Sequence, residues 1–177
     1  MRMSRQLWLI RHAKSSWDDP SLSDRQRPLA ERGHKAAKLM ASHYASQFSQ
    51  LESVHYSPAL RAQQTCEYWL AQRSQYIKGS EVEVDLQISC ENSLYTFRWA
   101  DLLVHIQSLP KQTNQIALVG HNPALEDLVN YLTGEDLIRF PTASLAVIEA
   151  DLEWQNWSEN SACLRLFDTP KKLAARL

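Results

Sequence analysis

Residues 7–12 are Leu-Trp-Leu-Ile-Arg-His, an apolar run that ends in two polar, chemically active side chains. Four consecutive apolar residues are typical of a strand that is buried on both faces of a parallel sheet. Two more short runs of this kind occur at residues 54–56 and 116–119. We therefore predict a mostly parallel sheet in which these three segments are strands.

Helical patterns separate the predicted strands. Apolar residues recur at steps of three and four within residues 29–44, 62–69, 99–106 and 125–132, which favours helices. Residues 144–150 and 162–167 are predicted to be two strands joined by a polar turn, forming an antiparallel edge. Polar segments 18–27 and 72–81 are predicted loops, the first long enough to overhang a site. This alternation predicts an α/β fold with helices on both faces of the sheet.

Composition limits the classes of protein to consider. A chain of 177 residues with 44% apolar and 22% charged residues suits a single soluble domain, residues 1–177. The net charge of −1 argues against nucleic-acid or membrane binding through a general positive field. The apolar run 7–10 is too short for a signal or membrane segment, so a cytoplasmic protein is expected. Three widely spaced cysteines without a CxxC pair favour neither disulfides nor a zinc site.

The residues just after the predicted strands converge on one kind of chemistry. Arg11-His12 comes after the first strand, Ser57-Pro58-Ala59-Leu60-Arg61 after the second, and Gly120-His121-Asn122-Pro123 after the third. Ligands of α/β sheets bind beyond the carboxyl ends of the strands, so these residues should share one edge. Ser57-Pro58 and Asn122-Pro123 predict capped helix N-termini there, which favour anions.

Two arginines and two histidines predict a phosphoryl-binding pocket. Arg11 and Arg61 could each bind phosphate oxygens with two hydrogen bonds, and no metal or cofactor is needed to neutralise the anion. Both arginines disfavour protonation of His12, which keeps its imidazole nucleophilic. His121 is expected to be a protonated stabiliser of developing charge. The remaining histidines lack the spacing of a metal site.

Three motifs carry a resemblance to a known family. Arg11-His12-Ala13-Lys14-Ser15, the segment from Ser57 to Thr65, and Val119-Gly120-His121-Asn122-Pro123 resemble the histidine phosphatase superfamily, which has the phosphoglycerate mutase-like fold. The SixA-like phosphohistidine phosphatase branch is most similar, and residues 27–33 and 140–142 share its pattern. The resemblance implies a layered helix/sheet/helix fold.

The resemblance also assigns roles to residues. It implies that His12 becomes phosphorylated and that Arg11, Arg61 and His121 complete the phosphate pocket. Ala13 stands where the family usually has glycine, which requires a less permissive backbone. Asp18 stands where the mutases have a phosphate-binding asparagine, and because its charge would repel phosphate we leave it out of the site. Lys14 is assigned to the loop.

The general acid is the least defined part of the predicted site. Many relatives use a carboxylate between the second and third motifs, and Glu91 is the candidate here. A site without a strong acid suits a P–N bond, because a departing imidazole needs less protonation than an alkoxide. A chain of this length also lacks a large cap, which predicts an open pocket that admits a histidine on another protein.

The sequence therefore predicts a metal-independent phosphohistidine phosphatase with a phospho-His12 intermediate. Its partners would be a phosphorylated protein or a small phosphorylated substrate, with inorganic phosphate as product. Two alternatives stay open. One is a phosphatase for small phosphomonoesters or pyrophosphate-linked metabolites, which would depend on Glu91. The other is a module that binds phosphorylated partners without turnover, which the complete set of pocket residues argues against.

Overall fold

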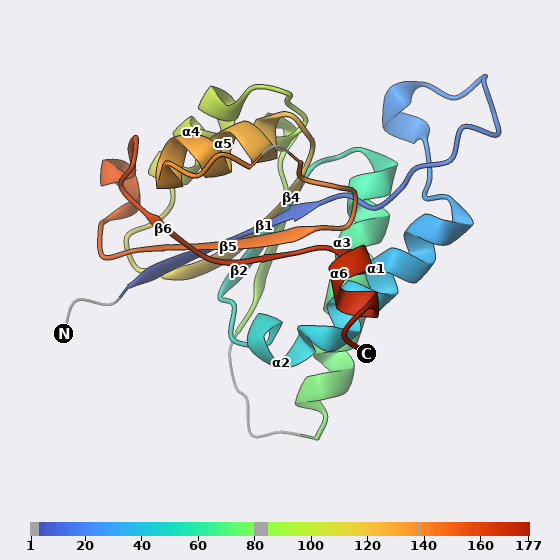
Figure 1. Ribbon diagram of the computed structural model, residues 1–177, viewed down its shortest axis with the longest axis horizontal. Helices are drawn as coiled ribbons and strands as arrows, with labels where there is room; N and C mark the ends of the chain where they lie inside the picture. Colours follow the sequence, from blue (N-terminus) through green and yellow to red (C-terminus); the bar gives the residue numbers. More distant parts are fainter. Residues whose placement is uncertain (1–3, 80–84, 138) are drawn as a thin grey trace.

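The computed structural model describes residues 4–79, 85–137 and 139–177. Within these residues one sheet has the strand order β3-β2-β4-β1-β5-β6 (Figure 1). The first four of these strands are parallel to one another, and β5 runs antiparallel to both β1 and β6. The strands are β1 (Arg5–Arg11), β2 (Ser53–Tyr56), β3 (Gln87–Cys90), β4 (Gln115–Gly120), β5 (Leu145–Ala150) and β6 (Cys163–Asp168).

Helices cover both faces of this sheet (Figure 1). The face covered by α4 (Trp99–Gln107) and α5 (Ala124–Thr133) forms one apolar core. The opposite core packs against α1 (Glu31–His43), α2 (Ala45–Phe48), α3 (Leu60–Ile77) and α6 (Pro170–Ala174). Short 3₁₀ helices are η1 (Asp24–Gln26), η2 (Asn92–Leu94) and η3 (Trp154–Asn156). None of the helices in the described part of the chain is long and apolar enough to cross a bilayer.

The first apolar run is the central element that joins the two cores. Leu7 and Leu9 pack into the core under α4 and α5, whereas Trp8 and Ile10 pack into the core on the opposite face. All four side chains are at most 3% exposed. A strand between two helical layers must be apolar on both faces, which is why this segment shows no polar alternation.

The architecture agrees with the predicted layered α/β fold, with the antiparallel pair β5 and β6 at one edge. The predicted loop at residues 72–81 is wrong, because α3 continues to Ile77 and buries Arg73; residues 80 and 81 lie outside the described residues. Neither β3 nor α6 was predicted. β3 is a short edge strand with a mostly exposed surface, so it carries no apolar run.

The carboxyl edge of the sheet, where β1, β2 and β4 end, brings distant segments together. Backbone pairing continues one residue beyond the strands: the His12 N–H donates to Gly120 O at 3.0 Å and the Ser57 N–H donates to Val119 O at 3.0 Å. These bonds fix the positions at which His12, Ser57 and His121 leave the sheet.

Gly33 allows the start of α1 to pack closely against the segment after His12. The Ala30 N–H donates to Lys14 O at 2.8 Å, and the Ser16 N–H donates to Pro28 O at 2.8 Å. A Cβ atom on Gly33 would lie 2.2 Å from Lys14 O. Because that oxygen belongs to a doubly tied backbone, it cannot move away without displacing the loop.

We expect Gly33→Ala to lower the free energy of unfolding by about 1–3 kcal/mol, the usual range for overpacking. This loss would outweigh the gain in helix propensity of up to ~1 kcal/mol. Chemical denaturation measures the change. Gly79→Ala is the matched control, because no described atom lies within 4 Å of its Cβ position. Equal stability of the Gly33→Ala protein and the wild type would contradict this packing argument.

Candidate active site

His12 lies at the carboxyl edge of the sheet with only 8% of its surface exposed. Its Nδ1 is 2.7 Å from Ala13 O, and Arg61 Nε is 3.3 Å from its Nε2. Arginine has no acceptor, so Nε2 must present its lone pair to Arg61. The proton is therefore on Nδ1 and is donated to Ala13 O.

The surroundings keep this imidazole neutral. Burial, aided by the charges of His121, Arg61 and Arg11, lowers the pKa of His12 to about 3, although the hydrogen bond to the Ala13 carbonyl acts in the opposite direction. The uncharged form prevails at neutral pH. A neutral ring with a fixed tautomer offers one nitrogen, Nε2, for attack on an electrophile.

Arg61 connects the pocket to the start of α3. Its Nη2 lies 3.4 Å from His121 Nδ1, so one guanidinium contacts both imidazoles. Thr65, one turn further along α3, donates from Oγ1 to Arg61 O at 2.7 Å and accepts the Ala13 N–H at 2.9 Å. This hydroxyl ties the backbone beside His12 to the helix that carries Arg61.

His121 completes the pair of imidazoles. It is 1% exposed, its ring centroid lies 5.0 Å from that of His12, and its Nε2 donates to Ser57 Oγ at 2.7 Å. Burial, followed by the charge of Arg61, lowers the pKa of His121 to about 4. The lowered pKa values favour neutral rings at pH 7, and a protonated His121 beside a reacting phosphoryl group stays a prediction. A bound dianion would raise both pKa values.

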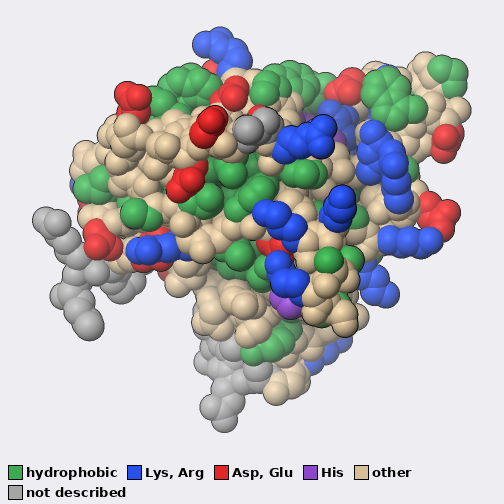
Figure 2. Space-filling model, viewed as in Figure 1, with side chains coloured by type: hydrophobic (Ala, Val, Ile, Leu, Met, Phe, Trp, Pro, Cys, Tyr) green, Lys and Arg blue, Asp and Glu red, His purple; other side chains and the backbone are tan. Residues whose placement is uncertain are grey.

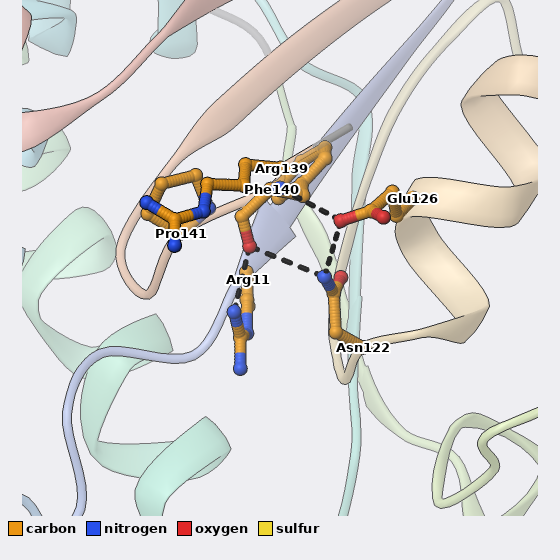
Figure 3. Close-up of a pocket in the computed structure, with 6 residues that line it drawn as sticks. All are labelled: Arg11, Asn122, Glu126, Arg139, Phe140 and Pro141. Carbon is orange, nitrogen blue, oxygen red and sulfur yellow. Dashed lines mark hydrogen bonds between the residues drawn. The ribbon is translucent and has the colours of Figure 1, made fainter. Parts of the chain in front are cut away.

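Arg11 is held by the segment before β5 (Figure 3). Its Nη1 donates to Phe140 O at 2.7 Å, and Asn122 Nδ2 reaches the same carbonyl at 3.2 Å. Glu126 Oε2 accepts from Asn122 Nδ2 at 3.0 Å and from the Phe140 N–H at 2.8 Å. Arg11 Nε is buried and has no partner among the described residues, which leaves a donor for a ligand. A cavity of about 230 Å³ opens beside this guanidinium.

The predicted caps are not formed. The N-cap of α3 is Ala59 and that of α5 is Pro123, so Ser57 and Asn122 are not the N-cap residues. Ser57 Oγ instead binds His121 and accepts the Ala59 N–H at 3.3 Å. Each helix begins one or two residues later than predicted because these polar side chains serve the site rather than the helix.

The structure does not bring Glu91 to the other predicted site residues. Its carboxylate accepts a hydrogen bond from Ser89 Oγ, and its charge acts on His55 and His105. Among the described contacts none joins Glu91 to His12, Arg61 or His121. Asp18 is exposed and bonded to Ser16, so it also lies apart from the pocket.

Asp24, which the sequence analysis did not single out, contributes a carboxylate to this pocket at Arg61. Arg61 donates from Nη1 to Asp24 O at 2.6 Å and from Nη2 to Asp24 Oδ2 at 2.9 Å. Tyr95 also donates to Asp24 Oδ2, at 2.6 Å. Burial raises the pKa of Asp24, but the hydrogen bonds from Tyr95 and Arg61 outweigh it, so the pKa is lowered overall. The loop 18–27 therefore overhangs the site through an ionised carboxylate.

The signals for the missed residues are weak. Asp24 lies in a loop with other acidic residues, and Tyr95 and Glu126 belong to no motif that implies contact with Arg61 or Arg11. In the described residues, no group of three or more His, Cys, Asp or Glu side chains could hold a metal ion.

We expect Asp24→Asn to tighten the binding of inorganic phosphate about tenfold. The reason is that a carboxylate would no longer repel an anion bound at Arg61. At an effective dielectric near 40 and a separation of about 5 Å, that repulsion is ~1.5 kcal/mol. Competitive inhibition or calorimetry measures the dissociation constant. Asp19→Asn is the control, since Asp19 is in the same loop but bonds to Ser21. Weaker phosphate binding after Asp24→Asn would contradict the expected repulsion.

We also expect stability to fall in mild acid. Below about pH 6.5 the unfolded chain protonates its histidines, whereas folded His12, with a pKa of about 3, stays neutral, so the unfolded state binds more protons and its population rises. His12→Gln should reduce the slope of unfolding free energy against pH, between about pH 6 and 4, by up to ~1.4 kcal/mol per pH unit. Urea denaturation across this range measures it; an unchanged slope would show that His12 is not buried in the neutral form.

Known proteins resemble this chain in sequence. Residues 7–86 match the model of the histidine phosphatase superfamily (branch 1). A chloroplastic protein of Arabidopsis thaliana, named as uncharacterized, is 28% identical over 155 residues, which cover 84% of this chain and 67% of that protein. An uncharacterized protein of Mycobacterium tuberculosis is 26% identical over 172 residues, covering 92% of this chain and all of the relative.

Solved structures extend the likeness over nearly the whole chain. A crystal structure assigned to the phosphohistidine phosphatase SixA of Agrobacterium tumefaciens has a TM-score of 0.73 and 27% identity, covering 94% of this chain and 98% of that one. The protein histidine phosphatase SixA complexed with tungstate has a TM-score of 0.74 at 23% identity, covering 95% and 99%. The family model, the sheet architecture and the neighbouring structures agree: the chain resembles the histidine phosphatase superfamily, and its fold is that of the SixA structures.

Proposed function

We propose that this protein is a phosphohistidine phosphatase that transfers the phosphoryl group to Nε2 of His12 and then to water. The observation that carries the proposal is the state of His12: its Nδ1–H is bound to Ala13 O and its Nε2 lone pair faces Arg61. An imidazole with that tautomer is ready to attack phosphorus without first losing a proton.

The reaction has two steps. In the first, Nε2 of His12 forms a bond to phosphorus while the P–N bond of the substrate breaks, and the departing imidazole takes a proton from solvent. In the second, water attacks phosphorus, the bond to Nε2 breaks, and inorganic phosphate leaves with the tautomer of His12 restored. No metal takes part in this scheme, since the cationic side chains balance the charge of the phosphoryl oxygens.

The donors around Nε2 suit a phosphoryl group. Arg61 offers its terminal nitrogens once Asp24 gives way, and Arg11 offers the unpartnered Nε. His121, held by Ser57, gains a proton most readily when a dianion is beside it. These groups come from the end of β1, the first turn of α3 and the residue after β4, so they can surround the phosphoryl oxygens rather than bind from one side.

The available carboxylates favour a P–N bond over a P–O bond. The lowered pKa of Asp24 makes it a poor proton donor near neutral pH. Glu126 accepts hydrogen bonds from Asn122 and the Phe140 N–H, and Glu91 accepts one from Ser89. An alkoxide leaving group needs a proton in the transition state, whereas imidazole departs with less assistance. The likeness to proteins described as SixA supports the same substrate class.

We expect His12→Ala to lower the turnover of a phosphohistidine protein by at least about 10³-fold, because the covalent route is lost. Wild-type enzyme quenched in alkali during turnover should carry radiolabelled phosphate on His12. Glu91→Gln is the matched control and should retain activity on phosphohistidine. The measurement is phosphate release from a phosphohistidine protein, from free phosphohistidine and from an aryl phosphate.

Full activity of His12→Ala would contradict the mechanism. Faster turnover of the aryl phosphate than of either phosphohistidine substrate, with loss of that activity in Glu91→Gln, would favour the alternative of a small-molecule phosphomonoesterase. Tight phosphate binding with no turnover of any of the three would favour the binding module.

A further inference from the structure

A strongly basic groove runs from the candidate active site toward the C-terminus. Its space of about 860 Å³ is lined by five charged residues, all cationic, together with small and polar residues; the charged ones are Arg11, Lys14, Arg32, Arg139 and Lys171. We call these five residues and the space between them the basic groove. Figure 2 shows Lys and Arg side chains gathered on this face of the molecule.

The charge of the basic groove is exceptional within this protein. The chain as a whole carries a net charge of −1, yet no acidic residue is among those that line the groove. In the described part of the chain, none of its five cations forms an ion pair; the paired cations are Arg5, Lys35, Arg61, Arg165 and Arg176. Unpaired like charges repel one another, so the binding of an anionic partner would reduce the electrostatic repulsion among these cations.

The groove is continuous with the cavity beside Arg11, which is the one candidate site residue that lines both spaces. Arg11, Arg139 and Pro141 line both the groove and the cavity beside Asn122 and Glu126. At the far end, Arg139, Pro141, Thr169 and Lys171 also line a further space of about 520 Å³ next to Phe167. Arg11 directly precedes His12 in the chain and lines the groove, so it links the candidate active site to the groove.

The shape and the cations favour an extended partner over a small second ligand. The charged residues come from the end of β1, the loop after it, α1, the segment before β5, and α6, and those on the last three are exposed. Exposed charges on separate elements can attract and orient an extended acidic chain. In a binding site for a second phosphate, by contrast, the cationic side chains would converge on one point.

We propose that the basic groove docks an acidic segment that flanks the phosphohistidine of a protein substrate. The proposal rests on the proposed function, because it assumes that the phosphoryl group enters the pocket beside Arg11. The phosphohistidine would be at the His12 end, and the glutamate or aspartate residues next to it would lie along Arg32, Arg139 and Lys171. The attraction would raise the rate of encounter and the affinity for the substrate, without changing the chemistry at His12.

The test uses two phosphohistidine peptides that differ in charge alone, one flanked by glutamates and one by glutamines. The variant is Arg32→Glu/Lys171→Glu. Both residues lie in the first turns of their helices, where a glutamate is compatible with the helix dipole, so the fold should be retained. The matched control is Lys38→Glu/Lys111→Glu, which makes the same change in net charge at exposed positions outside the groove.

We expect wild-type kcat/KM to be about tenfold higher for the glutamate peptide than for the glutamine peptide, and salt at about 0.5 M to remove most of this difference. Arg32→Glu/Lys171→Glu should lose the preference through KM, with kcat retained. The control pair should keep it. Hydrolysis of an aryl phosphate should be equal in all three proteins.

Three results would overturn the docking proposal: equal kcat/KM for the two peptides in the wild type, an undiminished preference in Arg32→Glu/Lys171→Glu, or the same loss with the aryl phosphate as with the glutamate peptide. The last would mean that the groove acts on the pocket or holds a small substrate. Failure of the proposed function is a different result, because neither peptide would then be hydrolysed by the wild type at any salt concentration.

Discussion

The proposed chemistry depends on the hydrogen bond from Nδ1 of His12 to Ala13 O. It selects the tautomer, and the tautomer decides that Nε2 is the free nitrogen. Burial then keeps that nitrogen unprotonated. The bond spans neighbouring residues, so it can persist only while the backbone beside His12 is held still, which the Thr65 hydroxyl does by accepting the Ala13 N–H.

The sheet supplies the other half of this constraint. The parallel strands β1, β2 and β4 end at the same edge. The hydrogen bonds from the His12 N–H to Gly120 O and from the Ser57 N–H to Val119 O extend their alignment beyond the last paired residues. His12, Ser57 and His121 are distant in sequence, but the strand ends place them close together without a long loop. Arg61 then needs only the first turn of α3 to reach both imidazoles, which suits a small protein with few residues to spare for positioning.

Much of this arrangement could be predicted from sequence because the relevant rules are local. Buried parallel strands have apolar runs, and the residues at their carboxyl ends must gather at one edge; His12, Arg61 and His121 were found in this way. Asp24 and Glu126 could not be, because their contacts depend on how a loop crosses the pocket and how the chain before β5 folds back on Asn122. Proline after a polar residue suggested capping at Ser57, but competition from His121 for the hydroxyl changed its role. Glu91 was predicted to be the general acid from its position between the second and third motifs, but position in the sequence does not determine where a side chain points in the fold.

The contact between Asp24 and Arg61 raises the question of why a pocket for anions keeps a carboxylate. Without it, a buried guanidinium would face two neutral imidazoles with no counter-charge, a costly arrangement in a poorly solvated site. Asp24 offsets that cost, and because it is on an overhanging loop and remains partly exposed, it can leave when a phosphoryl group replaces it. In the proposed mechanism, substrate binding exchanges one anion for another at Arg61. This exchange would reduce the net electrostatic gain, so the product phosphate would be held weakly and released after each turnover.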